Sequence, residues 1–325
     1  MKTQAIRIDR NGPPDVMQVF EIDVRDPGPD EVRVRQQAVG LNYVDIYFRS
    51  GLYKAPLPHG LGTEGAGVVE AVGSGVDFLK AGDRVAYASG PLGAYGGLYV
   101  LPAAGVVKLP ASIGFEQAAA AMLKGLTVQY LFRQTYRLQG HETILFHAAA
   151  GGVGLIACQW ARALGVKLIG TVGSEDKARL AREHGAWATI NYSAEDVVAR
   201  VRELTGGAKV PVVYDSVGKD TWERSLDCLQ PRGLMVSFGS SSGPVTGVDL
   251  TILTQKGSLF VTRPTLATHV TPRQRLENSA RELFQLMRAG KIRIDVARRY
   301  RLDQVAQAHE DLAGRRTTGS SVLIP

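Results

Sequence analysis

The sequence is poor in cysteine and contains no long apolar run. Its only two cysteines, Cys158 and Cys228, stand far apart in the chain. Two distant cysteines cannot build a disulfide framework or a four-cysteine metal site, so we expect both to be small core residues in a reducing compartment. No apolar run reaches the roughly 18 residues of a membrane-spanning helix, and the N-terminus lacks the order of a signal peptide. We expect a cytoplasmic protein with no membrane partner.

A concentrated basic block is also missing. The chain has 38 basic and 31 acidic residues, a formal net charge of +7, but the basic residues are scattered. Only Arg298–Arg299 and Arg315–Arg316 form small clusters. This distribution is typical of a solvated surface and does not favour nucleic acid as a partner, although RNA binding stays open as a less favoured function.

The length of 325 residues exceeds the roughly 250 to 300 of a single core and indicates two domains. Residues 1–124 contain short strands between glycine-rich and proline-rich turns, with alternating polarity in 31–40 and 64–73. Residues 125–262 alternate strands and helices, which predicts a doubly wound parallel sheet covered on both faces. The strands are expected at 143–148, 167–172, 188–190, 211–217, 234–239 and 258–262.

Two helices are expected with clear ends. Residues 174–185 begin with Ser174 as N-cap and end at Gly185, and residues 273–290 have a long helical pattern. The segment after residue 262 is too short for a core of its own, so we expect it to return to the first domain. The predicted organisation is an α/β protein with domains 1–124 plus 263–325 and 125–262.

The stretch "HAAAGGVGLIACQWARALG", residues 147–165, lies where a strand ends and a helix begins. Glycines there let the backbone turn sharply and approach a pyrophosphate, which the helix N-terminus then binds. The strand, helix and second strand around this turn favour a dinucleotide site over a purely structural turn. The cofactor-binding residues expected in it are Ala150, Gly151, Gly152, Val153 and Gly154.

The end of the second strand indicates which dinucleotide binds. An acidic residue there would hydrogen-bond the ribose of NAD, but this chain has Gly173 and Ser174. Lys177 and, as a second candidate, Arg179 could supply positive charge for a 2′-phosphate, and Ser174 could both cap the helix and donate to the phosphate, so we expect NADPH. The alternative is that Ser174 only caps the helix and Lys177 is only a solvated residue.

Many ordered segments resemble the medium-chain dehydrogenase/reductase superfamily and, within it, the zinc-free quinone oxidoreductases related to zeta-crystallin. They include "GLNYVDIYFRSGLY", "GLGTEGAGVVEAVGSGV", "AGDRVAY", "LKGLTVQYL", "VVYDSVG" and "LMVSFGSSSG". The resemblance covers the whole chain. It implies a mostly β, GroES-like catalytic domain, a Rossmann cofactor domain, and reduction of a quinone by NADPH.

The resemblance also indicates which chemistry is absent. Zinc-dependent relatives hold a catalytic metal at the positions that match Asn42, Thr63 and Leu123, none of which supplies the imidazole or thiolate that zinc favours. We therefore expect no metal. Without it, the protein has to supply position and polarity to the cofactor and the quinone.

By resemblance, Asn42, Thr127 and the segment that includes Phe238, Gly239 and Ser240 border the nicotinamide. Gly173, Lys177 and Tyr192 surround the adenosine phosphate, although Tyr192 could also be a structural aromatic at the sheet edge. The expected catalytic residues are Asn42, Thr127, Tyr47 and Tyr53. The two tyrosines are included because tyrosines can stack on a quinone and donate to its carbonyls. Tyr43 is expected in the core, and Asp45 is expected to orient a hydroxyl or cap a helix.

The sequence leaves the exact reaction and the assembly open. The same pocket would suit an NADPH-dependent reductase of activated alkenes, such as enones or enoyl thioesters. The family is associated with both one-electron and two-electron reduction of quinones. Relatives dimerise through their cofactor domains, and residues 258–264 have the pattern of an edge strand ended by Pro264, so we expect a homodimer.

Overall fold

Residues 1–325 are described by the computed structural model, in which the chain divides into two units. The first unit consists of Met1–Leu126, Val270–Gly290 and Ile294–Pro325, and the second of Thr127–His269 with Lys291–Arg293. The domain boundaries expected from the sequence stay a prediction, and these units differ from them mainly at residues 263–269. This segment belongs to the second unit, where Arg263 donates to the Gly239 carbonyl and His269 stacks on Tyr130.

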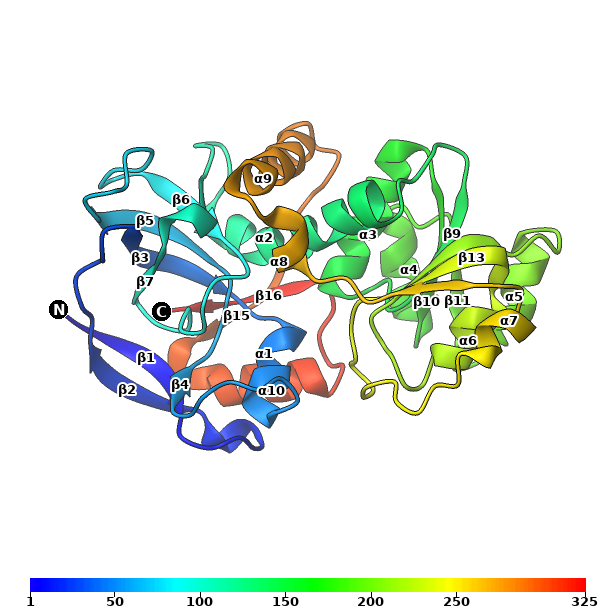
Figure 1. Ribbon diagram of the computed structural model, residues 1–325, viewed down its shortest axis with the longest axis horizontal. Coiled ribbons are helices and arrows are strands. Elements are labelled where there is room, and N and C mark those ends of the chain that lie inside the picture. Colours follow the sequence, from blue (N-terminus) through cyan, green and yellow to red (C-terminus); the bar gives the residue numbers. More distant parts are fainter. The chain divides into compact units, whose positions relative to one another are not determined.

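A six-stranded parallel sheet forms the centre of the second unit (Figure 1). Its order is β11-β10-β9-β12-β13-β14, and every neighbouring pair is parallel. The parallel, doubly wound sheet predicted from the sequence is confirmed. The strands are β9 (Thr143–Phe146), β10 (Lys167–Val172), β11 (Ala188–Asn191), β12 (Val210–Asp215), β13 (Leu229–Ser237) and β14 (Phe260–Thr262).

Helices follow the strands of this sheet. The chain runs from β9 toward β11 on one side and from β12 toward β14 on the other, so right-handed crossovers place the two sets of helices on opposite faces. The reversal lies between β9 and β12, which is where doubly wound sheets bind ligands. The helices are α3 (Gly152–Leu164), α4 (Glu175–Glu183), α5 (Val197–Leu204), α6 (Trp222–Asp227), α7 (Thr251–Gln255) and α8 (Leu266–Val270).

The strand positions predicted from the sequence differ from the structure most at β13. The strand begins at Leu229 rather than at residue 234, because Val210 pairs with Leu229 before the register shifts and Val212 pairs with Leu234. The irregular segment between these pairs includes Arg232 at a positive φ of 62°. Residues 229–233 were not predicted as part of the strand, because Pro231 and Gly233 are atypical of a strand interior.

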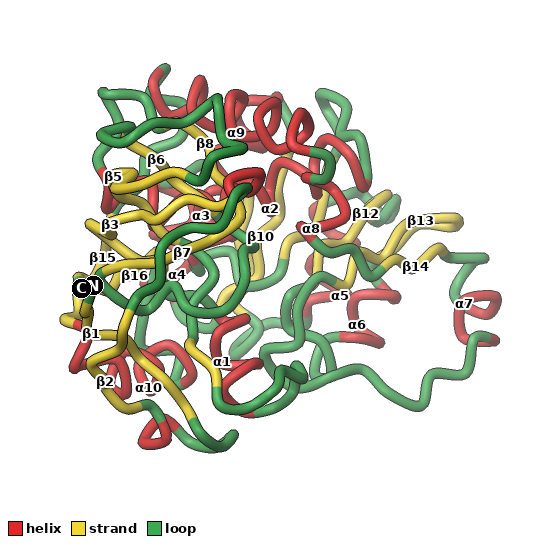
Figure 2. The backbone as a smooth tube through the Cα atoms, turned by 60° about the vertical axis from the view of Figure 1, so that its left-hand side comes forward, coloured by secondary structure: helices red, strands yellow, loops and turns green.

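Strands form two sheets in the first unit (Figure 2), and most neighbouring strands in them are antiparallel. One sheet has the order β15-β16-β3-β5-β6-β8, with β7 also paired to β3, and a smaller sheet has the order β2-β1-β4. The strands are β1 (Lys2–Ile8), β2 (Gln18–Asp23), β3 (Glu31–Gly40), β4 (His59–Gly60), β5 (Gly65–Val72), β6 (Arg84–Tyr87), β7 (Leu98–Pro102), β8 (Val106–Lys108), β15 (Val296–Arg301) and β16 (Ser320–Ile324). The C-terminal segment returns to this unit as expected, since β16 pairs with β3.

Alternation along β3 predicted a half-buried strand, but the structure buries polar positions too. Val32 and Val34 lie in the core, and Arg33 and Gln36 are also buried. Arg33 donates to Glu70 and Asp26 at 2.8 Å each. Because buried polar groups must be hydrogen-bonded, only the neighbouring strand and loop make this burial possible.

Four helices complete the first unit: α1 (Tyr43–Ser50), α2 (Phe115–Tyr130), α9 (Arg273–Arg288) and α10 (Val305–Ala313). α2 continues past Leu126 into the second unit, so the division falls inside a helix. No helix is both long and apolar enough to cross a membrane. Both cysteines are buried and unpaired, as predicted.

Candidate active site

The glycine-rich turn after β9 leads into the N-terminus of α3. Gly151 is the N-cap, in extended conformation. A Cβ on Gly154 would overlap the carbonyl oxygens of Ala148 and Ala149, so only glycine lets the first turn of α3 approach the end of the strand. The first amides of the helix lack helical partners, so an anionic group at this helix N-terminus can accept from them.

A buried polar network holds the ends of β9 and β12 where the strand order reverses. Asp215 Oδ2 accepts from the hydroxyls of Thr221 and Ser225 at 2.6 and 2.7 Å. The Ser225 oxygen in turn lies 2.9 Å from His147 Nε2, and His147 Nδ1 lies 2.9 Å from the hydroxyl of Thr171.

These contacts fix the proton positions of His147. Since Ser225 donates to a carboxylate, it accepts from His147 Nε2–H, and Nδ1 accepts from Thr171. Burial lowers the pKa of His147, while the pKa of Asp215 lies below its usual value, because its neighbours outweigh burial. The network rigidifies the turns beside the predicted dinucleotide site.

Four residues predicted to surround the adenosine phosphate come together at the carboxyl ends of β10 and β11. Tyr192 N donates to the Val172 carbonyl at 3.0 Å, and a Cβ on Gly173 would lie 2.6 Å from the Tyr192 hydroxyl. The Ser174 hydroxyl accepts from Lys177 N at 3.4 Å, which confirms Ser174 as the N-cap of α4. α4 ends at Glu183, and Gly185 follows at a positive φ of 104°.

The two acidic residues after Ser174 have other partners. Glu175 accepts from the Asn191 side chain at 3.0 Å, and Asp176 forms an ion pair of 3.0 Å with Arg179. Both are exposed. The end of β10 therefore presents glycine, a hydroxyl and a lysine, a set that suits a phosphate better than a bare ribose.

The segment after β13 is held by an arginine to which sequence analysis gave no role. Arg263 donates to the Ser237 carbonyl at 3.1 Å, to the Gly239 carbonyl at 2.8 Å and to the Ser240 hydroxyl at 3.0 Å. A Cβ on Gly239 would lie 2.9 Å from Ser216 Cα. Residues Phe238, Gly239 and Ser240 are thus fixed close to the segment that follows β12.

In the first unit, Asn42 precedes α1 and joins two buried networks. Its backbone N–H donates to Asp45 Oδ2 at 2.9 Å, so Asp45 caps the start of the helix as expected. Its side-chain Nδ2 donates to Glu64 Oε2 at 2.7 Å, and its Oδ1 accepts from Lys124 Nζ at 2.8 Å. Asn42 is 4% exposed, so its orientation is set by these partners.

Asp45 ends a chain of hydrogen bonds whose direction can be assigned. A guanidinium only donates, so Arg49 donates to His309 Nδ1 at 3.2 Å, and neutral His309 carries its proton on Nε2. His309 Nε2 lies 3.1 Å from the Tyr95 hydroxyl, which donates to Asp45 Oδ2 at 2.8 Å. Burial lowers the pKa of His309 to about 3 and raises the pKa of Asp45 to about 7.

The two predicted catalytic tyrosines lie side by side. The ring centroids of Tyr47 and Tyr53 are 5.1 Å apart, and Tyr47 is buried while Tyr53 is 36% exposed. Tyr43 is partly exposed rather than a core residue, because it sits in the first turn of α1 with its hydroxyl 3.5 Å from the Ala313 carbonyl. Thr127 lies in α2 and is buried.

The positions matched to zinc ligands do not fit a metal. Asn42 Oδ1 already accepts from the Lys124 ammonium, whose charge would repel a dication. Thr63 offers only a hydroxyl and Leu123 no polar side chain. No group of three or more His, Cys, Asp and Glu side chains is placed to hold a metal ion.

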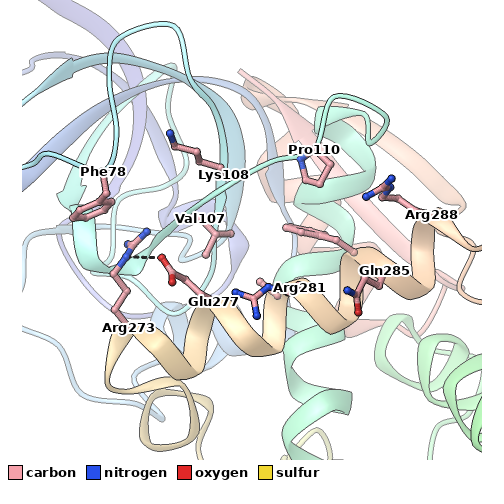
Figure 3. A pocket seen from close by; sticks show the side chains of 11 residues that line it. Phe78, Val107, Lys108, Pro110, Arg273, Glu277, Arg281, Gln285 and Arg288 are labelled. Atoms are coloured by element: carbon pink, nitrogen blue, oxygen red, sulfur yellow. Dashed lines mark ion pairs between the residues drawn. The ribbon is translucent and has the colours of Figure 1, made fainter.

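Each unit contains a cavity. In the first unit, a cavity of about 370 Å³ lies between parts of α9 and β8 (Figure 3), with Arg281 and Gln285 on the helix side and Val107 and Lys108 on the strand side. Arg273 pairs there with Glu277 at 2.9 Å. In the second unit, a cavity of about 380 Å³ is lined by Thr262, Arg263 and His269. No predicted catalytic residue lines either cavity.

The buried polar partners of the site were not predicted from the sequence. Glu64 and Lys124 stand inside the segments "GTEGAG" and "LKGLT", and His147 directly follows β9. A charged residue inside an otherwise apolar or glycine-rich segment is the signal that could have indicated Glu64 and Lys124. Nothing in the sequence pairs His309 with Tyr95, which lie more than 200 positions apart.

The chain is similar to known proteins over nearly its whole length. Residues 28–111 match the alcohol dehydrogenase GroES-like domain, and residues 152–285 match the zinc-binding dehydrogenase family. A quinone oxidoreductase of Pseudomonas aeruginosa is 65% identical over 97% of both chains. The crystal structure of Escherichia coli quinone oxidoreductase complexed with NADPH has a TM-score of 0.98 and 58% identity, covering 99% of this chain and 100% of that one. A 2-haloacrylate reductase of a Burkholderia species is 43% identical over 98% of both chains.

Proposed function

Because this chain belongs to the quinone oxidoreductases of the medium-chain dehydrogenase/reductase superfamily, we propose that it reduces quinones with electrons from NADPH and without a metal. The observation that carries the proposal is the end of β10, where Gly173, Ser174 and Lys177 replace the acidic residue of an NAD site. The relatives named quinone oxidoreductase, one of them solved with NADPH, support it.

In the second unit, the proposed cofactor site has three parts. The glycine turn and the N-terminus of α3 bind the pyrophosphate through backbone amides. The 2′-phosphate accepts from the Ser174 hydroxyl and Lys177, beside the Tyr192 ring. Thr127 and the segment held by Arg263 contact the nicotinamide. The proposed contacts are Ala150, Gly151, Gly152, Val153, Gly154, Gly173, Ser174, Lys177, Tyr192, Thr127, Phe238, Gly239 and Ser240.

In the first unit, Asn42, Tyr47 and Tyr53 are proposed to bind the nicotinamide and the quinone. When bound, NADPH supplies the reducing electrons. Each tyrosine ring has a flat face on which a planar acceptor can stack, and the hydroxyls can donate to its carbonyl oxygens. The Asn42 carboxamide, held in one orientation, supplies a further donor. Water can protonate the reduced oxygens, so the residues need only orient the acceptor and stabilise its charge.

The rate of NADPH oxidation tests this proposal. We expect metal-stripped protein to turn over NADPH with a small para-quinone, and to use NADH much less well. Activity that appears only after zinc is added would contradict the metal-free proposal. Equal use of NADH and NADPH would contradict the role given to the end of β10.

A second candidate is an NADPH-dependent reductase of activated alkenes. The identity of 43% to a 2-haloacrylate reductase supports this candidate, because a haloacrylate carries a polarised C=C bond. Running an enone and a 2-haloacrylate beside the quinone distinguishes the two activities. A kcat/KM for the alkene above that for the quinone would move the function to alkene reduction and leave the cofactor site unchanged.

We also propose a cytoplasmic homodimer joined at the second unit. β14 is an edge strand, and its Phe260 and Val261 side chains are 56% and 39% exposed. Unpaired apolar edges are a liability that pairing with a second copy removes. A solution mass near 35.0 kDa, that of one chain, would reject the dimer.

A further inference from the structure

Asn42, Glu64 and Lys124 form a closed triangle of hydrogen bonds in the first unit. Lys124 Nζ donates to Asn42 Oδ1 at 2.8 Å and to Glu64 Oε2 at 3.3 Å, while Asn42 Nδ2 donates to Glu64 Oε2 at 2.7 Å. The other carboxylate oxygen accepts from Leu123 N at 2.6 Å. The Lys124 and Glu64 side chains are 7% and 0% exposed, so the triangle contains a buried ion pair.

The carboxylate of the triangle packs closely against the backbone of β3. Gly40 faces it from β3, and a Cβ at that position would overlap Glu64 Oε2 and the Ala119 carbonyl oxygen. Glu64 immediately precedes β5, which pairs with β3, and Lys124 lies in α2. Two strands and a helix therefore fix the charged atoms.

A buried ion pair is poor evidence for stability. Removing two charges from water costs several kcal/mol per ion, and apolar replacements of similar volume are often neutral or stabilising. The triangle nevertheless does something that apolar residues could not do. It binds the Asn42 carboxamide at both ends, with a cation on Oδ1 and an anion on Nδ2.

This arrangement permits only one orientation of the carboxamide. A turn of 180° about the last side-chain bond would place the NH₂ group against the ammonium and the oxygen against the carboxylate. The ion pair also polarises the amide, because the ammonium draws electron density toward Oδ1 and makes the N–H groups better donors. Nδ2 has a second N–H and uses only one for Glu64.

Two more polar atoms near the triangle have no partner. The Thr63 hydroxyl, one residue before Glu64, and Asp45 Oδ1, three residues after Asn42, are buried without a hydrogen bond. A buried polar atom left unpaired costs about 1–3 kcal/mol, so each needs an explanation. A polar ligand that meets these atoms would satisfy them.

We propose that Lys124 is a positioning residue for quinone reduction. Through the triangle it directs the second Asn42 N–H at a carbonyl oxygen of the acceptor, and the ammonium stabilises the negative charge that develops on that oxygen. This proposal rests on the proposed function. The residue that touches the acceptor is Asn42, and Lys124 and Glu64 act through it.

The double variant Lys124→Met/Glu64→Gln separates this role from a structural one. Each single change leaves a buried charge unpaired and lowers Tm, whereas the double change removes both charges and restores Tm. We expect the double variant to lose about tenfold or more in kcat with the quinone, while its Kd for NADPH stays that of the wild type. Lys108→Met is the matched control, because Lys108 is exposed and pairs with Asp83.

A double variant with restored Tm and a kcat within about twofold of wild type would overturn the proposal. If the double variant does not fold, Asn42→Ala tests the proposal instead, because it leaves the Lys124–Glu64 pair in place. We expect Asn42→Ala to lose as much kcat as the double variant would. An unchanged kcat in Asn42→Ala would equally overturn it. A wild-type protein that reduces no quinone is a different result, which rejects the proposed function.

A spectroscopic readout does not depend on turnover. In protein labelled with ¹⁵N-asparagine, one Asn42 side-chain proton is expected well downfield, because it is bound to a carboxylate. The signal should return to the usual range in Lys124→Met/Glu64→Gln and stay unchanged in Lys108→Met. An Asn42 signal that is the same in all three proteins would show that the ion pair does not hold the carboxamide.

Discussion

The Tyr95 hydroxyl donates a hydrogen bond of 2.8 Å to Asp45 Oδ2, and both side chains are buried. The carboxylate also accepts from a backbone amide, but its second oxygen has no partner. Burial outweighs the two hydrogen bonds and raises the pKa of Asp45 to about 7. The folded protein therefore keeps a proton that the unfolded chain releases at about pH 4.

The first prediction concerns Asp45 and pH. Between about pH 4 and 7 the folded state binds the extra proton, so the contribution of Asp45 to stability falls as pH rises, by roughly 1.4 kcal/mol per pH unit at most. Denaturant unfolding of wild type and Asp45→Asn across this range should show the wild type losing stability relative to the variant. A difference that does not change with pH would mean that Asp45 is ionised in the folded protein.

The second prediction concerns His309 at acidic pH. Burial lowers its pKa to about 3, so the stability that it contributes is present above about pH 6.5 and is lost as pH falls toward 3. His309→Asn should weaken this loss, which urea titrations at pH 7, 5 and 4 can measure. If both proteins lost the same unfolding free energy as pH falls, His309 would not be buried in its neutral form. In the wild type the two effects oppose each other between about pH 4 and 6.5.

The third prediction concerns the glycine turn. In Gly154→Ala the new methyl group would meet two backbone carbonyl oxygens, which cannot move aside as a side chain would. We expect a loss of about 1–3 kcal/mol in unfolding free energy and weaker NADPH binding. Gly140→Ala is the control, since its Cβ would lie 3.5 Å from the Leu164 carbonyl oxygen, an ordinary contact. Tight NADPH binding by Gly154→Ala would argue against the turn as the pyrophosphate site.

The fourth prediction concerns Lys177 and the choice of cofactor. Lys177→Gln should raise KM for NADPH by about tenfold and leave KM for NADH almost unchanged, because only NADPH carries the 2′-phosphate that a charged donor would bind. Arg179→Gln controls for charge, as Arg179 lies on the same helix but pairs with Asp176 and Glu183. If KM rose equally for NADPH and NADH, Lys177 would not be a ligand of the 2′-phosphate.

The fifth prediction concerns the paired tyrosines. Tyr47→Phe and Tyr53→Phe keep the rings, whose centroids lie 5.1 Å apart, and remove the hydroxyls. If the hydroxyls donate to quinone carbonyls, at least one variant should lose about 1 kcal/mol or more in kcat/KM, roughly fivefold, with NADPH affinity unchanged. Steady-state kinetics with a small para-quinone measure this. Two variants with wild-type kinetics would place the quinone elsewhere.

Local patterns in the sequence were sufficient for the parallel sheet, for β10, for the N-cap at Ser174 and for the glycine turn before α3. Each depends on residues within one strand, one turn or one helix, where apolar periodicity, capping and backbone sterics act over a few positions. The grouping of Tyr192 with Gly173 and Lys177 came instead from the family resemblance, which covers the whole chain.

Only the tertiary structure decided the buried polar pairs. Lys124 meets Asn42 and Glu64 across 82 and 60 positions, and His309 meets Tyr95 across 214. No local pattern encodes such contacts, because a charged residue enters a core only when packing brings its partner within hydrogen-bonding distance. The sequence by itself determined the family, the sheet and the glycine turn, whereas folding decided which donors and charges surround Asn42.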